Sequence, residues 1–294
     1  MGWVLQMQGN KTKRVAIITG GSQGIGACIA EAFARSGYST IICSRTKPDV
    51  DREAENIRLA GFDCEGIVLD VADPDAVRTA ISAIAEKYGR LDVLVNCAGI
   101  YGPIGPLEEN DAKLWEQAVR INICGTAFCT RAAIPIMKKG GCGCIICFAG
   151  AGAGGNSIKP NISSYVASKF GICGFTEAMS NELKGTGIRI NAISPGAVNT
   201  RLLSQVLSAG EKAGKDFLQA SIKQKETGGT PPKLAADLAL YLASDEASHI
   251  SGKVLSAVWE KKEALCAMKD KLGGPLYTLR RIDDVMYQEK KKGG

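Results

Sequence analysis

The 294-residue chain has a single histidine, His249, and lacks any long apolar run. A lone histidine argues against His-based catalytic triads and His-rich zinc sites, which need imidazoles at set positions. No apolar run approaches the roughly 20 residues that span a membrane. The first ten residues lack the basic lead and long apolar core of a signal peptide, and Gln6 breaks the myristoylation pattern. We therefore expect a cytoplasmic protein with no membrane partner.

Strong charge of one sign is missing too. The net charge is +6, and much of it comes from basic residues near the end of the chain, at 280–281 and 290–292. Such runs near a terminus usually form a solvated end. A nucleic-acid-binding face needs basic residues with aromatics between them, and the sequence has no such stretch. We expect no nucleic acid among the partners.

The 11 cysteines are an odd number, which does not suit a disulfide scaffold in a chain of this size. Most sit in apolar runs, where a free cysteine behaves as a small hydrophobic residue. Cys144 and Cys147 belong to the one cluster, but their odd spacing would point them to opposite faces of a strand. The sequence predicts buried thiols, no metal site and a reducing compartment.

What the chain does have is a regular alternation of strand and helix patterns. With 45% hydrophobic and 22% charged residues it reads as an ordinary globular chain, long enough for one large domain. The expected strands are 14–18, 39–43, 64–69, 91–95, 144–148, 188–193 and 253–258. The expected helices are 27–35, 51–60, 73–87, 111–137, 163–183, 201–225 and 233–242. Alternation of this kind predicts an α/β fold, a doubly wound (Rossmann) parallel sheet of about seven strands with helices on both faces.

The domain is expected to span 13–260, with a flexible leader at 1–12 and a polar C-terminal extension at 261–294. The extension either covers a neighbouring subunit, closes the pocket or is a loosely held tail. In a doubly wound sheet, ligands bind beyond the carboxyl ends of the strands. The stretches of interest all lie at such ends: 19–26, 43–47, 70–71, 96–99, 148–155 and 194–200.

The first of these stretches contains Gly20, Gly24 and Gly26. Glycines let the backbone turn and approach a pyrophosphate, while the following helix N-terminus supplies amide donors. After the first strand of an alternating chain, this triplet indicates a dinucleotide site, with a tight turn that binds nothing as the alternative.

The end of the second strand distinguishes the two nicotinamide cofactors. An NAD site usually has an acidic residue there, but the run from Cys43 to Lys47 has none. Arg45 and the neighbouring hydroxyls suit a 2′-phosphate instead. We therefore favour NADP(H) over NAD(H), although a solvated turn would look the same.

Tyr165 and Lys169 are four residues apart in an expected helix, so their side chains share a face. A cation near a phenol favours the phenolate and lowers its pKa from about 10, which lets the tyrosine pass a proton near neutral pH. Taken alone, the pair is also what an ordinary helix surface would carry.

Taken together, these motifs resemble the classical short-chain dehydrogenase/reductase family over residues 13–258. The resemblance rests on the glycine spacing, Asp70-Val71, Asn96-Cys97-Ala98-Gly99, Asn122, the Tyr165–Lys169 pair and the stretch from Pro195 to Thr200. It implies cofactor contacts from Gly20, Ser22, Gln23, Gly24, Ile25, Gly26, Ser44, Arg45, Thr46, Asp70, Val71, Asn96, Ala98, Gly99, Tyr165, Lys169, Pro195, Gly196, Val198 and Thr200.

The resemblance also implies a mechanism. Tyr165 would protonate a carbonyl oxygen as hydride leaves the nicotinamide. Lys169 would lower the pKa of Tyr165 and hold the ribose, and Asn122 would hold a water that relays protons to Lys169. The Val198 backbone and Thr200 would anchor the nicotinamide. A homodimer or homotetramer through the two long helices is the assembly the family suggests, acting on a small carbonyl or alcohol substrate.

One departure from the family concerns the serine that normally follows the fifth strand. Residues 148–155 contain no hydroxyl. Losing one such donor typically lowers the rate by about 10² to 10³. Either glycine-loop amides at Gly150 and Ala151 contact the substrate, or Ser157 reaches in, or turnover is weak. We favour the first account.

The sequence thus predicts an NADP(H)-dependent oxidoreductase that interconverts a ketone and a secondary alcohol. The alternative is a sensor or scaffold that kept the fold and the cofactor with little catalysis. An epimerase or dehydratase fits less well because its glycine spacing differs. The 201–230 segment is the expected substrate lid. Because the lid is polar, a bulky steroid-like substrate is disfavoured, while a polar ketone, a sugar derivative or an acyl thioester all remain open.

Overall fold

A computed structural model describes residues 13–150, 152–153, 158–272 and 274–279. Its centre is one sheet of seven parallel strands in the order β3-β2-β1-β4-β5-β6-β7. The strands are β1 Val15–Thr19, β2 Ser39–Ser44, β3 Cys64–Val68, β4 Val93–Asn96, β5 Gly143–Phe148, β6 Ile188–Ser194 and β7 Val254–Ser256. The doubly wound parallel sheet expected from the alternating pattern is confirmed.

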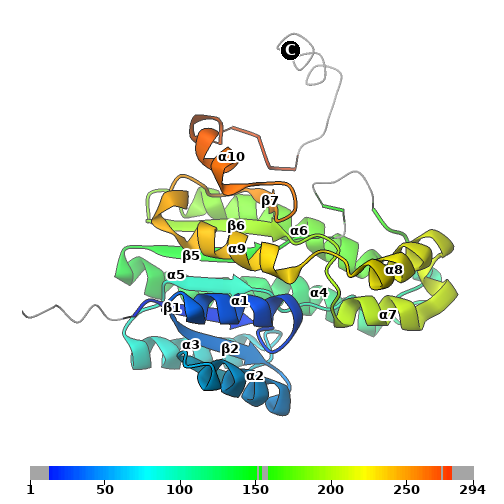
Figure 1. Ribbon diagram of the computed structural model, residues 1–294, viewed down its shortest axis with the longest axis horizontal. Helices are drawn as coiled ribbons and strands as arrows, with labels where there is room; N and C mark the ends of the chain where they lie inside the picture. Colours follow the sequence, from blue (N-terminus) through cyan, green and yellow to red (C-terminus); the bar gives the residue numbers. More distant parts are fainter. Residues whose placement is uncertain (1–12, 151, 154–157, 273, 280–294) are drawn as a thin grey trace, which may run out of the picture.

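Helices cover both faces of this sheet (Figure 1). On one face lie α1 Gly24–Arg35, α2 Lys47–Leu59 and α9 Pro232–Ala243, and on the other α3 Pro74–Tyr88, α4 Ala112–Val119, α5 Gly125–Gly140 and α6 Ser163–Glu182. The helices α7 Arg201–Ala209 and α8 Lys215–Thr227 project together beyond one end of the sheet (Figure 1).

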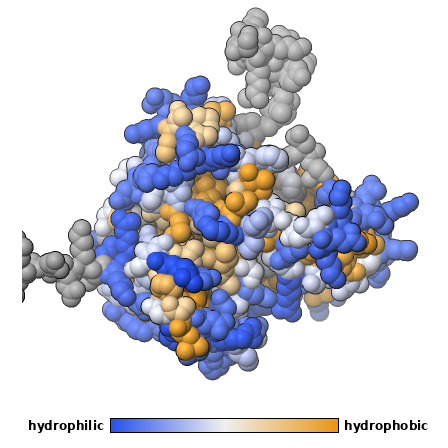
Figure 2. All heavy atoms as spheres, in the orientation of Figure 1, coloured by the Kyte–Doolittle hydropathy of each residue, from blue (hydrophilic) through white to orange (hydrophobic). Residues whose placement is uncertain are grey.

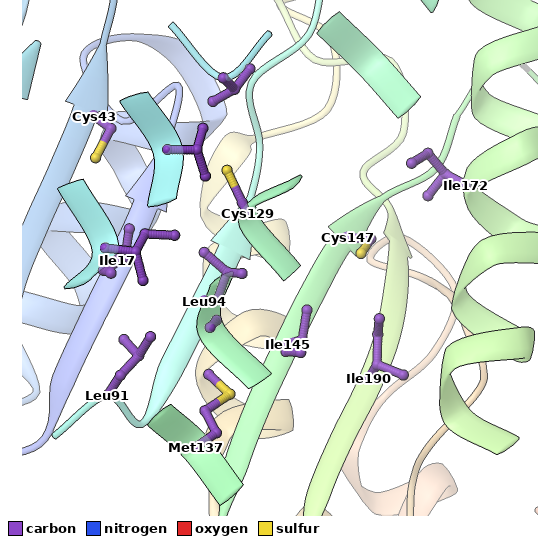
Figure 3. Packing of buried hydrophobic residues seen from close by; sticks show 14 of the residues in the cluster. Ile17, Cys43, Leu91, Leu94, Cys129, Met137, Ile145, Cys147, Ile172 and Ile190 are labelled. Atoms are coloured by element: carbon purple, nitrogen blue, oxygen red, sulfur yellow. The ribbon is translucent and has the colours of Figure 1, made fainter. Parts of the chain in front are cut away.

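The core divides into layers because alternate residues of each strand face opposite ways. In β5, Ile145 and Cys147 pack toward α5 and α6, with Met137, Cys129 and Ile172 among their neighbours (Figure 3). Cys144 packs in the opposite layer, with α1 and α9. The expectation that Cys144 and Cys147 point to opposite faces is confirmed.

The order in which successive strands are added to the sheet reverses between β1 and β4. The chain builds β2 and β3 outward from β1, then crosses to add β4 on the other side. Thr19 and Asn96 are register partners at the carboxyl ends of β1 and β4. The Thr19 hydroxyl accepts hydrogen bonds from the backbone N–H groups of Cys97 and Ala98, at 3.2 Å each. This ties the two strand ends together at the switch point, where open α/β sheets bind ligands.

Two expected helices differ from what is found. The single helix at 111–137 begins after Asp111, whose carboxylate caps α4, but it contains a π-helical turn, Arg120–Cys124, before α5. The expected helix at 201–225 is interrupted by a short 3₁₀ turn, Gly210–Ala213, between α7 and α8. Gly210 and Gly214 have φ values of +57° and +86°, which end a right-handed helix.

The described part of the C-terminal extension packs against the domain. It contains α10, Lys262–Ala267, and a 3₁₀ turn, Lys269–Lys271. Leu265 and Leu272 are buried in the layer formed by α9. The Lys253 ammonium donates to the carbonyl oxygens of Gly274 and Leu276, at 2.7 and 3.0 Å. Of the three accounts for the extension, the loose tail is wrong for 261–272 and 274–279. The boundary at 260 stays a prediction, and the leader 1–12 lies outside the described residues.

None of the described helices is both long and apolar enough to cross a membrane. Hydrophilic side chains cover most of the face in Figure 2, with apolar ones gathered around α9 and α1. All 11 cysteines are free, and the described ranges hold no group of three or more His, Cys, Asp or Glu side chains that could bind a metal ion.

Candidate active site

A cavity of about 270 Å³ opens at the carboxyl ends of β1, β2 and β4. Its walls come from six separate places along the chain: 20–26, 43–46, 69–71, 97–100, Ile121 of the π-helical turn, and Thr200 with the start of α7. The predicted cofactor residues that line it are Gly20, Ser22, Gln23, Gly24, Ile25, Gly26, Ser44, Arg45, Thr46, Asp70, Val71, Ala98, Gly99 and Thr200. Four of the six strand ends singled out in the sequence thus meet at this cavity, and of the stretch 194–200 only Thr200 lines it, while 148–155 contributes no wall.

The glycine loop is packed so closely that side chains are excluded. Gly20 has a φ of +67°, and a Cβ there would lie 2.9 Å from the Ala98 backbone. A Cβ on Gly26 would overlap the carbonyl oxygen of Gly20. The Gly20 N–H is held by the Cys43 carbonyl at 2.8 Å. The cavity floor is therefore bare backbone at the N-terminus of α1, the arrangement that suits a pyrophosphate.

The end of β2 offers a cation with no acidic partner. Arg45 lines the cavity and is exposed, and it makes no ion pair with the described residues, whereas Lys47 is paired with Asp51 at 2.6 Å. The Asp70 carboxylate accepts a hydrogen bond from the N–H of Ala72 at 2.9 Å and so shapes the turn after β3. An unpaired guanidinium beside Ser44 and Thr46 is suited to a phosphate group.

Other predicted contacts lie outside the walls of this cavity. Asn96 is buried beneath the loop and donates to the Thr130 hydroxyl at 3.2 Å. Gly196 packs against Thr230 and Val258. The remaining ones are Tyr165, Lys169, Pro195 and Val198. Cofactor contacts from all six stay predictions.

The expected catalytic side chains converge next to the cavity. Tyr165 and Lys169 come from α6, with the Lys169 ammonium 5.4 Å from the centre of the Tyr165 ring. Asn122 comes from the π-helical turn, a deformation that often marks functional sites. A Cβ on Gly99 would lie 3.2 Å from Asn122 Oδ1 and 3.7 Å from Lys169 Nζ, so the two side chains flank the cavity loop.

The Asn122 side chain organises that loop. Its Oδ1 accepts from the N–H of Ile100 at 2.9 Å, and its Nδ2 donates to the carbonyl of Ile100 at 2.8 Å and to Ser168 Oγ at 2.9 Å. Both amide hydrogens are used, so the described contacts of the side chain are structural. A water held by Asn122 stays a prediction.

Burial controls the protonation of the Tyr165–Lys169 pair. It raises the pKa of Tyr165 well above its ordinary value, with Tyr101 and Cys97 as smaller causes, and it lowers the pKa of Lys169. The ammonium donates its hydrogen bond to the carbonyl of Phe148, at 2.8 Å, and lies beside the ring of Tyr165. The expected lowering of the Tyr165 pKa by Lys169 is therefore not found. Burial therefore favours the protonated phenol of Tyr165, and its role in proton transfer stays a prediction.

Comparison with known proteins decides the family. Residues 14–210 match the family model described as short chain dehydrogenase. This chain belongs to the short-chain dehydrogenase/reductase family. It is an NAD(P)-dependent oxidoreductase, as the family assignment and its named reductase relatives establish.

Several relatives are reductases. The short-chain reductase protein NovJ of Streptomyces niveus is 35% identical over 82% of this chain and 91% of its own length. The 3-oxoacyl-[acyl-carrier-protein] reductase FabG of Thermotoga maritima is 34% identical over 82% of this chain and 95% of its own. A variant of actinorhodin polyketide ketoreductase, crystallised with NADPH, superimposes with a TM-score of 0.75 at 29% identity, covering 83% of this chain and 95% of that one.

This short-chain dehydrogenase/reductase lacks a hydroxyl where the chain leaves β5. Gly150 has a φ of +143°, and a Cβ built on it would lie 3.5 Å from the Tyr165 hydroxyl. A side chain at Gly150 would therefore face the Tyr165 hydroxyl, so the chain lacks a hydroxyl next to the predicted proton donor. The other two candidates for its role, Ala151 and Ser157, lie outside the described residues.

The family motifs did not identify every residue of the cavity. Its walls also include Cys43, Leu69, Cys97, Ile100, Ile121, Arg201, Leu202 and Gln205. Gln205 Oε1 is buried and has no hydrogen-bond partner in the described part of the chain. Gln205 follows Arg201 by four residues, so the two share a helix face. This four-residue spacing directly after Thr200 is the sequence signal that could have identified Arg201 and Gln205 as cavity residues.

Proposed function

We propose that this short-chain dehydrogenase/reductase uses NADP(H) to interconvert a ketone and a secondary alcohol, with Tyr165 as the acid/base. The observation that carries the proposal is the position of the Tyr165 phenol. It lies beside Lys169 and Gly150 at the end of β5, adjacent to a cavity with a glycine floor. Its hydroxyl has no partner among the described residues, so it is available to a substrate oxygen.

The cavity residues fit a dinucleotide phosphate. The bare backbone around Gly20 and Gly26 leaves room for a diphosphate, and Arg45 supplies an unpaired guanidinium at the end of β2. Arg201, at the start of α7, adds a second cation to the cavity walls. These groups support NADP(H) over NAD(H), because a 2′-phosphate needs a cation where a ribose hydroxyl would need a carboxylate.

Each residue then has a distinct task. A bound nicotinamide supplies the hydride, or accepts it in the reverse direction. Tyr165 gives its proton to the substrate oxygen, and burial keeps it protonated for that step. Lys169 is fixed beside the Tyr165 ring by the Phe148 carbonyl and would hold the nicotinamide ribose. Asn122 keeps the 99–100 backbone in place.

The protonated form of Tyr165, which burial favours, is the form that donates in carbonyl reduction. The small-molecule substrate of the enzyme is a polar ketone, a sugar derivative or an acyl thioester. The 11 free cysteines suit a reducing, cytoplasmic setting. A homodimer or homotetramer through the two long helices completes the proposal, and light scattering would measure the mass directly.

A second candidate is a cofactor-binding sensor or scaffold with little turnover. The absence of a hydroxyl at Gly150 is the observation that favours it, since such a donor contributes about 10² to 10³ in rate.

The test is to follow NADPH absorbance with a panel of carbonyl compounds, using wild type, Tyr165→Phe and Tyr88→Phe. Tyr88, at the end of α3, donates to the Glu65 carboxylate on β3 and does not line the cavity, so Tyr88→Phe is the matched control. We expect oxidation of NADPH by wild type and the control, and none by Tyr165→Phe. Tight NADPH binding without oxidation across the panel, unchanged in Tyr165→Phe, would favour the sensor.

A further inference from the structure

The reaction centre needs a second hydrogen-bond donor, and a residue from a different strand end is placed to provide it. Tyr101 comes directly after residues 97–100, the loop that leaves β4. That loop lines the cavity, and Tyr101 itself does not. Its ring contacts that of Tyr165 edge to face, with the centroids 4.5 Å apart and the planes at 64°. Aromatic pairs prefer this geometry, which is worth about 0.5–1.5 kcal/mol beyond burial alone.

The backbone on both sides of Tyr101 is fixed. Asn122 holds the N–H and the carbonyl of Ile100. Ser164, next to Tyr165 on α6, donates to the Tyr101 carbonyl at 2.9 Å. Gly102 has a φ of +76° and packs so tightly that a Cβ would lie 2.7 Å from both Ala118 and the Ser164 hydroxyl. The backbone on both sides of Tyr101 is therefore held by α4, α6 and the π-helical turn.

The Tyr101 hydroxyl has no other use in the described part of the chain. No described residue pairs with it, just as none pairs with the Tyr165 hydroxyl. Burial raises the pKa of Tyr101 to about 12, so the group stays protonated across the neutral range. Tyr101 is also the largest cause after burial of the raised pKa of Tyr165, which agrees with two closely placed phenols.

We propose that the Tyr101 hydroxyl donates a hydrogen bond to the substrate oxygen and takes the part of the serine missing at Gly150. This inference rests on the proposed ketone–alcohol activity. Tyr165 gives its proton to the substrate oxygen, whereas Tyr101 keeps its own proton and only stabilises the developing negative charge. The substrate oxygen accepts from both phenols, and Gly150, whose Cβ position lies 3.5 Å from the Tyr165 hydroxyl, contributes no side chain of its own.

The first experiment compares Tyr101→Phe with wild type and with Tyr88→Phe. The phenylalanine keeps the edge-to-face contact and removes only the oxygen. We expect kcat for carbonyl reduction to fall by about 10² to 10³, the usual effect of losing one such donor. The Kd for NADPH, measured by fluorescence, should stay within about twofold, because Tyr101 is not among the cavity walls.

Tyr101→Leu, which removes the ring as well, separates the hydroxyl from packing. Equal losses in Tyr101→Phe and Tyr101→Leu support the hydroxyl. A near-normal Tyr101→Phe beside an impaired Tyr101→Leu shows that only the ring matters and overturns the inference, leaving backbone amides as the donors. NADPH binding and circular dichroism on each variant exclude misfolding as the cause.

The two proposals fail in different ways. If Tyr165→Phe is inactive while Tyr101→Phe keeps full kcat, the ketone–alcohol activity stands and only the role of Tyr101 is rejected. If wild type oxidises no NADPH with any carbonyl compound, the proposed function is rejected and the role of Tyr101 with it.

Discussion

The Nζ of Lys169 lies 2.8 Å from the carbonyl oxygen of Phe148, the last residue of β5. This bond joins α6, which carries Tyr165, to the strand end where the family's serine is replaced by glycine. Lys169 is buried, and its charge is compensated by carbonyl dipoles rather than by a carboxylate in the described part of the chain. A buried charge held by a carbonyl dipole in this way lowers the stability of the fold.

Lys169→Met should abolish carbonyl reduction and raise stability at neutral pH. Removing a buried charge gives back several kcal/mol of desolvation, while the orphaned Phe148 carbonyl costs about 1–3 kcal/mol. We expect a net gain of about 1 kcal/mol or more in the free energy of unfolding at pH 7, measured in urea.

The stability advantage of Lys169→Met over wild type should become smaller as the pH rises. The folded pKa of Lys169 is lowered from 10.5. Between that lowered pKa and 10.5, the unfolded chain binds more protons, so wild type gains stability as pH rises and the variant does not. The advantage of Lys169→Met should thus shrink toward pH 10.5. Lys233→Met, at an exposed lysine, should show little change, and a pH-independent difference for Lys169→Met would contradict the argument.

Arg45→Ala tests the cofactor preference. A charge-assisted hydrogen bond contributes about 1.5–3 kcal/mol, so the KM for NADPH should rise roughly 10- to 100-fold, while that for NADH changes little. Lys47→Ala is the matched control, because Lys47 is two residues away, is paired with Asp51 and does not line the cavity. Equal weakening of both cofactors in Arg45→Ala would mean that Arg45 does not read the 2′-phosphate.

Asn161, in the loop before α6, contacts the segment 201–230 that the sequence predicts to be the substrate lid. Its φ is +62°, its Nδ2 donates to the Lys212 carbonyl at 2.9 Å, and its carbonyl accepts from the Gly105 N–H at 2.8 Å. Asn161→Gly keeps the backbone conformation and removes the bond to Lys212. We expect the KM for the carbonyl substrate to rise about two- to tenfold, from a bond worth 0.5–1.5 kcal/mol.

Asn161→Val is the comparison for that prediction. A β-branched residue at positive φ adds strain of about 1–3 kcal/mol, which should appear in the free energy of unfolding. If Asn161→Gly leaves the KM unchanged, the bond to Lys212 does not hold the lid.

The C-terminal segment should contribute to the stability of the domain. Leu265 of α10 is fully buried against the α9 layer, and Leu265→Ala should lower the free energy of unfolding by about 2–5 kcal/mol in a urea titration. Trp259→Ala removes a larger side chain, but that side chain is 80% exposed, so the free energy of unfolding should change by no more than about 0.5 kcal/mol. Similar effects of the two substitutions would mean that residues after 260 are not part of the folded unit.

The sequence determined the architecture because the signals for it are local. Runs of β-branched residues predict all seven strands to within a few residues. Their alternation with helical stretches then predicts a doubly wound sheet, which the strand order confirms. The glycines at 20, 24 and 26 and the four-residue spacing of Tyr165 and Lys169 are equally local. The family resemblance added Asn122, which the structure places beside Lys169.

Only the tertiary structure decided how these groups are held and charged. The bonds from Asn122 to Ile100 and from Lys169 to Phe148 join residues about twenty positions apart along the chain, through loops that have no periodic pattern. Burial, which raises the pKa of Tyr165, depends on everything packed around it. The contact of Tyr101 with Tyr165 spans β4 and α6, and no spacing rule connects them. A residue's neighbours along the chain fix its secondary structure, but the protonation and partners of a catalytic group are fixed by what the fold brings next to it.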